Sequence, residues 1–273
     1  MKPTQHTTTS KDGTVIAYEQ TGSGPAVILV NAALADRTGS TKLAALLAEK
    51  FTCINYDRRG RGQSTDVQPY SPAREVEDIA ALIDTVGGSA SLFGQSSGAI
   101  LALDAAAALG SKVHGLIMFE PPFVVDASRQ PIPNELGAQA GELVKAGKPA
   151  DAIKLFFGKV MGIPGFGVTI MKLVMPTWKN MLASAGTLPY DFAIAKGTQD
   201  GTPLPAKRWS GLTAPVLVMV GAKSEQYFHS GAKALDDLLP SAEYRSLPGV
   251  SHGSATMSPK SFIQVVFAFL QSH

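Results

Sequence analysis

Residues 91–99 read SLFGQSSGA and carry the clearest structural signal in this sequence. An apolar run typical of a buried strand leads into Gly-x-Ser-x-Gly, and an Ala-rich helical stretch follows from Ser97. This pattern is typical of a tight strand-to-helix turn that holds the central serine above the carboxyl edge of a sheet. Gly94 and Gly98 suit such a turn because they carry no Cβ. The stretch predicts an α/β fold in which Ser96 is the nucleophile.

On both sides of this turn, short apolar runs alternate with segments whose apolar residues are spaced as on one face of a helix. Continuous apolar runs of four to eight residues are typical of strands buried on both faces of a parallel sheet. The alternation predicts βαβ units. The predicted strands are 14–20, 26–30, 52–56, 89–93, 113–119, 214–220 and 242–247. The predicted helices are 41–50, 72–86, 97–109, 227–239 and 259–271.

The pattern changes after Pro121 and Pro122. From there to about residue 208 the sequence has helical stretches but no convincing apolar strand, and regular alternation then resumes. Both ends of this insertion return to the same predicted sheet. We therefore expect one core domain, residues 1–121 and 209–273, that carries a helical cap, residues 122–208.

Composition excludes several classes of protein. The chain has 273 residues, 45% hydrophobic and 17% charged, with a net charge of +2, and its basic residues form no stripe for nucleic acid. No stretch approaches the roughly 20 apolar residues needed to span a membrane. Cys53 is the single cysteine, which excludes an intramolecular disulfide and a cysteine-based zinc site. The polar first 13 residues do not resemble a secretory signal, so we expect a cytoplasmic protein.

A serine hydroxyl needs a base to remove its proton, and His252 is the predicted base. It lies in a Gly-rich loop, residues 247–253, between the last predicted strand and the last helix. That loop leaves the sheet at the edge where Ser96 emerges. His229 is the second candidate, although it is predicted to lie on a helix. The remaining histidines are at the chain ends or the opposite edge of the sheet: His6, His114 and His273.

Three motifs together resemble the α/β-hydrolase superfamily. They are GQSSG at 94–98, DRRGRGQS at 57–64, which is similar to D-x-R-G-x-G-x-S, and the late Gly-x-x-His that ends at His252. The resemblance implies an eight-stranded, mostly parallel sheet flanked by helices, a helical cap and hydrolysis through an acyl-enzyme. The 57–64 segment is expected to be a structural turn shaped by its glycines. We expect neither a cofactor nor a metal.

The sequence departs from the family pattern at the acid of the catalytic triad. The loop after residues 216–220 reads GAKS where relatives usually have an aspartate, and Glu225 stands one position later. Glu120 closes another apolar strand and is followed by two prolines. Pairing with His252 would offset the cost of burying its charge. A resemblance to the zearalenone-lactonase branch favours Glu120, while Glu225, a dyad and another acid remain alternatives.

The oxyanion of an acyl-transfer intermediate needs hydrogen-bond donors already in place. One predicted donor is the backbone N–H of Ser97, at the positive end of its helix. The second is expected in the loop Asn31-Ala32-Ala33-Leu34, where relatives often carry His-Gly. Ala33 is the preferred donor and Ala32 its neighbour, because a backbone amide needs no particular side chain. Asn31 is expected to stabilise this loop.

The predicted cap is richer in apolar residues than a solvated surface requires. Part of this set is expected to line a hydrophobic substrate pocket. The candidates are Phe157, Met161, Met175 and Trp178.

Together these residues predict a serine hydrolase that cleaves a small-molecule carboxylic ester or lactone with a hydrophobic group. A carbon–carbon bond hydrolase or a cofactor-free perhydrolase or haloperoxidase could use the same triad. A receptor that binds its ligand without turnover is the alternative from another class. We expect no nucleic-acid or membrane partner, and either a monomer or a homodimer.

Overall fold

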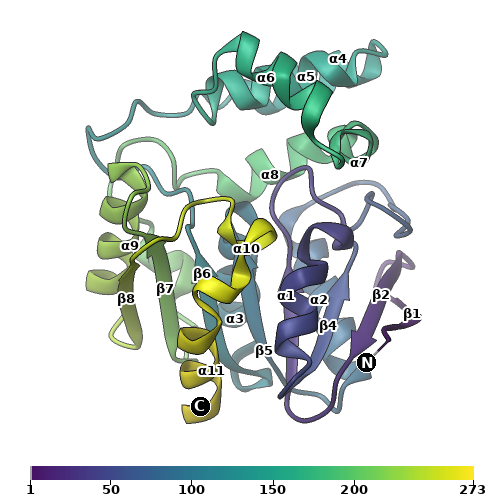
Figure 1. Cartoon of the computed structure of the whole chain (residues 1–273), viewed down its shortest axis with the longest axis vertical. Helices are drawn as coiled ribbons and strands as arrows, with labels where there is room; N and C mark the ends of the chain where they lie inside the picture. Colours follow the sequence, from purple (N-terminus) through teal and green to yellow (C-terminus); the bar gives the residue numbers. More distant parts are fainter. Residues whose placement is uncertain (1) are drawn as a thin grey trace.

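The computed structural model describes residues 2–273 and contains an eight-stranded sheet in the order β1-β2-β4-β3-β5-β6-β7-β8 (Figure 1). The first two pairings, β1 with β2 and β2 with β4, are antiparallel, and all others are parallel. The predicted eight-stranded, mostly parallel sheet is confirmed. The strands are β1 (Thr4–Thr9), β2 (Val15–Thr21), β3 (Ala26–Val30), β4 (Thr52–Tyr56), β5 (Ala90–Gln95), β6 (Val113–Phe119), β7 (Val216–Gly221) and β8 (Ala242–Leu247).

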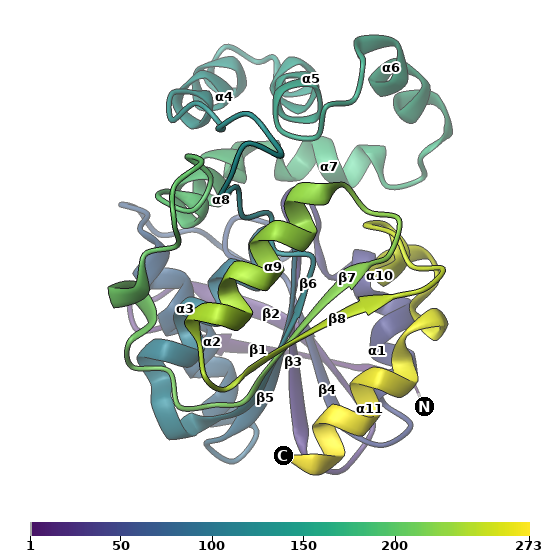
Figure 2. The same cartoon turned by 90° about the vertical axis from the view of Figure 1, so that its left-hand side faces the viewer.

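Helices cover both faces of this sheet, which explains the continuous apolar strands (Figure 2). In β3, Ile28 and Val30 enter one buried cluster, and Val27 and Leu29 enter the other. The first cluster includes side chains of α2 (Pro72–Thr85), α3 (Ser97–Leu109) and α9 (Gln226–Leu238). The second includes those of α1 (Thr41–Leu47) and α11 (Ile263–Ser272). Successive side chains point to opposite faces of a strand, so a strand in the middle layer must be apolar throughout.

Residues 122–208 form a layer of helices beyond the carboxyl ends of the strands (Figures 1 and 2). The helices are α4 (Leu136–Lys145), α5 (Pro149–Lys159), α6 (Gly165–Val174), α7 (Trp178–Ser184) and α8 (Leu188–Ala195). In α6, Phe166 and Leu173 are 72% and 79% exposed. Within residues 2–273, no helix is both long enough and apolar enough to cross a membrane.

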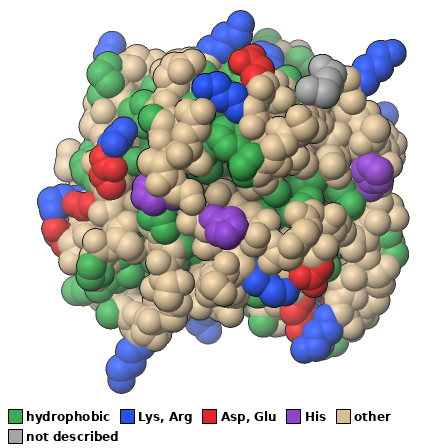
Figure 3. Space-filling view, turned by 90° about the horizontal axis from the view of Figure 1, so that it is seen from below, with side chains coloured by type: hydrophobic (Ala, Val, Ile, Leu, Met, Phe, Trp, Pro, Cys, Tyr) green, Lys and Arg blue, Asp and Glu red, His purple; other side chains and the backbone are tan. Residues whose placement is uncertain are grey.

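The structure differs from the sequence-based elements mainly at the periphery. Strand β1 was not expected, because its exposed sequence TQHTTT has no apolar alternation; it pairs with β2 at the sheet edge. The predicted terminal helix begins later, at Ile263, after a 3-10 turn over Pro259–Ser261, and a short helix α10 (Ser254–Met257) precedes it. On the face opposite the cap, neither charge sign gathers into a patch (Figure 3).

Candidate active site

The turn from β5 to α3 holds Ser96 in a conformation that L-residues rarely adopt, with φ 54° and ψ −125°. A Cβ on Gly94 would lie 2.5 Å from the Cα of Ala99, and one on Gly98 would collide with the carbonyl oxygen of Val30. Both glycines are therefore required by close backbone packing, as the Gly-x-Ser-x-Gly spacing predicts. Strain of this kind concentrates at functional sites.

His252 and Glu120 form a direct contact, with Nδ1 of the imidazole 2.7 Å from Oε2 of the carboxylate. Glu120 is fully buried just after β6, and its Oε1 accepts hydrogen bonds from the Gly221 N–H at 2.8 Å and the Ser224 hydroxyl at 2.5 Å. The ring of Phe228 stacks on the imidazole with 5.0 Å between centroids. These contacts fix both the carboxylate and the plane of the imidazole.

The carboxylate of Glu120 is held in its charged form. Burial alone would raise its pKa, but hydrogen bonds from His252, Ser224 and the Gly221 backbone outweigh burial and lower the pKa below its usual value. A charged acceptor at Nδ1 keeps the proton on that nitrogen. Nε2 of His252 is then free to accept a proton.

Ser96 and His252 line the same cavity. Within residues 2–273 no hydrogen bond joins the Ser96 hydroxyl to the imidazole. Catalytic hydrogen bonds are often long without substrate and tighten when it binds. The structure thus brings the predicted nucleophile and base to one cavity, with Glu120 behind the base.

The alternative candidates lie elsewhere. Glu225 immediately precedes α9, its side chain is 66% exposed, and its carboxylate is 3.8 Å from the Arg129 guanidinium. His229 hydrogen-bonds through Nδ1 to the Tyr244 hydroxyl at 2.6 Å and does not line the cavity that contains Ser96. The geometry therefore favours Glu120 and His252.

The loop after β3 lies beside Ser96, where the second oxyanion donor is expected. Asn31 stabilises it, because its Oδ1 accepts from the Ser40 hydroxyl and its Nδ2 donates to the Tyr56 carbonyl at 3.4 Å. Ala33 lines the cavities around Ser96, and the carbonyl of Ala32 accepts from Arg61 at 2.6 Å. The amide of Ser97 begins α3 on the other side of the site.

A buried ionic cluster connects the cap to both sides of this candidate oxyanion hole. Asp191, from α8, accepts from the Ser97 hydroxyl at 2.8 Å, from Arg58 at 2.8 Å and from Arg61 at 2.7 Å. Glu75 forms a bidentate pair with Arg58 at 2.7 and 2.8 Å. Burial opposes the charge of Asp191, but the two arginines lower its pKa. Sequence reasoning missed this cluster and treated residues 57–64 only as a turn.

We expect the Asp191→Ala variant to lose about 3–5 kcal/mol of unfolding free energy. The substitution leaves Arg58 and Arg61 buried without their shared carboxylate. Urea unfolding followed by circular dichroism measures the loss. Glu135→Ala, on the exposed surface of the cap, is the control and should change stability by less than about 0.5 kcal/mol, because this side chain makes no capping hydrogen bond. A loss below about 1 kcal/mol in Asp191→Ala would contradict a structural role for the cluster.

The cavity beside His252 has a volume of about 470 Å³ and is mainly apolar. Phe157, Met161 and Met175 line it, as predicted, together with residues of α6 and α7. Trp178 does not line it. Its side chain is 8% exposed because the start of α7 places it in the apolar cluster of the cap, near Val168.

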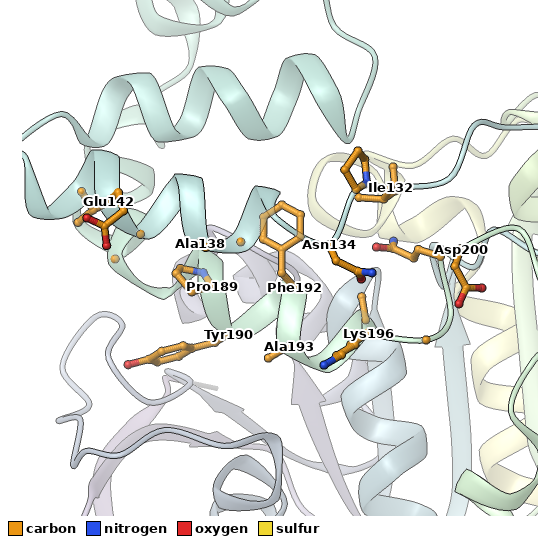
Figure 4. A pocket seen from close by; sticks show the side chains of 18 of the residues that line it. Ile132, Asn134, Ala138, Glu142, Pro189, Tyr190, Phe192, Ala193, Lys196 and Asp200 are labelled. Carbon is orange, nitrogen blue, oxygen red and sulfur yellow. The ribbon is translucent and has the colours of Figure 1, made fainter.

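A second, much smaller cavity of about 30 Å³ lies on another side of Ser96. Arg129 is in its wall, and this basic residue was not anticipated from the sequence. A groove of about 590 Å³ between α4 and α8 lies beyond it and contains none of the candidate catalytic residues (Figure 4). Within residues 2–273, no group of three or more His, Cys, Asp or Glu side chains could hold a metal ion.

Comparison with known proteins finds the same fold in hydrolases. A sequence profile described as "Alpha/beta hydrolase family" matches residues 27–265. A crystal structure of an alpha/beta hydrolase from Sphaerobacter thermophilus DSM 20745 is 42% identical, with a TM-score of 0.88, and the match covers 97% of this chain and 100% of that chain.

Two characterised or catalogued hydrolases also match this chain in sequence. The bifunctional esterase/perhydrolase DCH of Acinetobacter calcoaceticus is 22% identical over 97% of this chain and 99% of that protein. The uncharacterized hydrolase YraK of Bacillus subtilis (strain 168) is 33% identical over 40% of this chain; the match spans 42% of the length of YraK.

Proposed function

The chain belongs to the alpha/beta hydrolase family, and we propose that it is a serine hydrolase that cleaves carboxylic esters or lactones with a hydrophobic group. The observation that carries this proposal is the 2.7 Å contact between the buried Glu120 and His252, which lines the same cavity as Ser96. A strained serine, an imidazole and a charged carboxylate are the parts that acyl transfer requires.

In the proposed reaction, the hydroxyl oxygen of Ser96 attacks the ester carbonyl while Nε2 of His252 takes its proton. The resulting oxyanion accepts hydrogen bonds from the backbone amides of Ser97 and Ala33. When this intermediate collapses, His252 returns the proton to the departing alcohol, and the acyl group stays on Ser96. Water then attacks the acyl-enzyme with His252 as base and releases the acid.

Glu120 acts on the base in this scheme and does not touch the substrate. Its charge stabilises the imidazolium that forms each time His252 takes a proton, and its hydrogen bond keeps Nε2 directed to the reaction. The additional bonds from Gly221 and Ser224 hold the carboxylate in place during both steps.

The proposal is tested with p-nitrophenyl esters and with aliphatic and aromatic lactones. We expect a burst of one p-nitrophenol per protein, where deacylation is slow, followed by many turnovers, and stoichiometric loss of activity with a fluorophosphonate. Reaction with the fluorophosphonate but no turnover of any substrate would instead indicate a receptor on a hydrolase scaffold.

Perhydrolysis is the second candidate, because a relative that covers nearly the whole chain is described as an esterase/perhydrolase. In that reaction hydrogen peroxide replaces water in the attack on the acyl-enzyme, and the product is a peracid. Adding hydrogen peroxide, acetate and bromide to the assay distinguishes the two reactions, because a peracid oxidises bromide to hypobromite and the bromination of monochlorodimedone can then be measured. An ester hydrolase without perhydrolase activity shows no peroxide-dependent halogenation.

A further inference from the structure

The two cavities that meet at Ser96 differ greatly in size, and we propose that they divide the substrate between them. The large cavity beside His252 takes a bulky apolar alcohol group, and the small cavity beside Arg129 takes an acetyl or propanoyl group. The substrate class is therefore short-chain acyl esters of large hydrophobic alcohols. This inference rests on the ester hydrolysis proposed above.

The position of His252 decides which part of the substrate enters which cavity. The imidazole must protonate the leaving alcohol oxygen, so the alcohol group lies on the side of His252. His252 and the next residue, Gly253, line the cavity of about 470 Å³. The wall of the small cavity contains Ser96 and Ser97 but not His252. The acyl group, which remains on Ser96 after the alcohol leaves, therefore points into the small cavity.

The small cavity limits the length of the acyl chain. A water molecule needs roughly 10–15 Å³ of such volume, so about 30 Å³ accommodates about two carbon atoms beyond the ester carbonyl. Val160 and Tyr227, in its wall, are 8% and 3% exposed, and the core around them is packed. A longer chain would have to displace buried side chains.

Two groups of side chains bound the far end of the small cavity. Ile132 and Phe192 line both the small cavity and the outer groove, and Figure 4 shows both side chains at the wall of the groove. Arg129 closes another side: its guanidinium lies 4.4 Å from the centre of the Tyr227 ring and donates a hydrogen bond to the Val160 carbonyl. An acyl chain that extends beyond these side chains must displace them.

The large cavity has the opposite character. Its wall includes the flexible apolar side chains of Met161, Met171, Met175 and Met181, and methionine adapts readily to irregular ligands. A volume of about 470 Å³ falls within the range of pockets that bind drug-sized molecules. Binding energy from burying a large alcohol group is therefore available on the leaving-group side.

The division predicts opposite trends in two substrate series. With 2-naphthol as the fixed alcohol, kcat/KM should fall at least about tenfold between the propanoyl and hexanoyl esters, since a misfitting methylene in a pocket costs roughly 10-fold or more. With acetate as the fixed acyl group, kcat/KM should rise from small alkyl to large aromatic alcohols. The alcohols of the second series should have similar pKa values, so that differences in leaving-group ability do not hide the effect of size.

Two variants test the roles of the two cavities independently. Val160 lines only the small cavity of the pair, and Val160→Ala removes two methyl groups while keeping the carbonyl that Arg129 bonds. We expect the ratio of butanoyl to acetyl activity to rise about tenfold, with the alcohol preference unchanged. Met175 lines only the large cavity, so Met175→Ala should alter the alcohol preference and leave the acyl ratio unchanged. Thermal unfolding checks that both variants are folded.

The outcomes separate this inference from the proposed function. Hydrolysis with equal rates for acetyl and hexanoyl esters, or a Met175→Ala variant that changes acyl preference instead of alcohol preference, overturns the division while ester hydrolysis stands. If no ester or lactone is turned over although a fluorophosphonate labels the protein, the proposed function fails, and this inference fails with it.

Discussion

Replacing Ser96 with alanine should lower kcat for ester hydrolysis by about 10⁶-fold. The variant loses the oxygen that forms the acyl-enzyme, while the candidate oxyanion amides and the His252–Glu120 pair remain. Residual catalysis of roughly 10³–10⁴ over the reaction in water should persist from those groups. Stopped-flow release of p-nitrophenol measures both values, and the burst phase should disappear completely.

Ser97→Ala is the matched control for this substitution. It removes the neighbouring hydroxyl, which bonds Asp191 at 2.8 Å, but keeps the Ser97 amide at the start of α3. We expect a loss of no more than about a hundredfold, because a hydrogen bond to a charged group contributes roughly 1.5–3 kcal/mol. A Ser96→Ala variant that still shows a burst, or equal losses in both variants, would show that Ser96 is not the nucleophile.

Replacing Glu120 with glutamine should lower kcat by about 10⁴-fold. The amide oxygen can still accept from Gly221 and Ser224, which leaves the NH₂ group directed at Nδ1 of His252. Nδ1 must then accept that hydrogen bond, so the imidazole proton moves to Nε2. His252 presents the wrong tautomer to Ser96, and the negative charge that stabilises the imidazolium is lost.

Glu225→Gln is the control, because its exposed carboxylate lies 3.8 Å from Arg129 and contacts no proposed catalytic group. Its kcat should stay within about twofold of the parent. Thermal unfolding of both variants separates loss of catalysis from loss of folding. If Glu225→Gln were inactive and Glu120→Gln nearly normal, the acid would have to be reassigned.

The central sheet could be predicted closely because its strands are apolar runs bounded by glycine, proline or charged residues. Strand β6 and helix α3 have the predicted limits, Val113–Phe119 and Ser97–Leu109. Strands at the edge of the sheet are harder to predict. Strand β1 is polar and exposed, and backbone hydrogen bonds pair it with β2. The side chains of such a strand need not alternate between apolar and polar, so its sequence gives no sign of it. Burial on both faces, rather than strand propensity, made the core predictable.

The residues of the candidate site could be predicted where a chemically suitable side chain stands in a recognisable local sequence pattern. Ser96 and His252 stand in Gly-rich turns at strand ends, and Glu120 ends a buried strand, so each has a local signal. Asp191 and Arg129 have none, because their contacts depend on how the cap packs against distant segments of the core. Trp178 was misplaced for the same reason: residue type alone does not tell which side of a helix faces a cavity.

The ionic cluster around Asp191 also constrains how the enzyme opens. Swinging the whole cap away would pull a buried aspartate from two arginines and from Ser97, at a cost of several kcal/mol. We therefore expect α8 to stay docked on the core, and we expect ligand exchange to involve movement of α6 and α7, whose residues line the large cavity. Access would then be controlled by the helix that exposes Phe166 and Leu173, and the candidate catalytic groups would keep their contacts while ligands exchange.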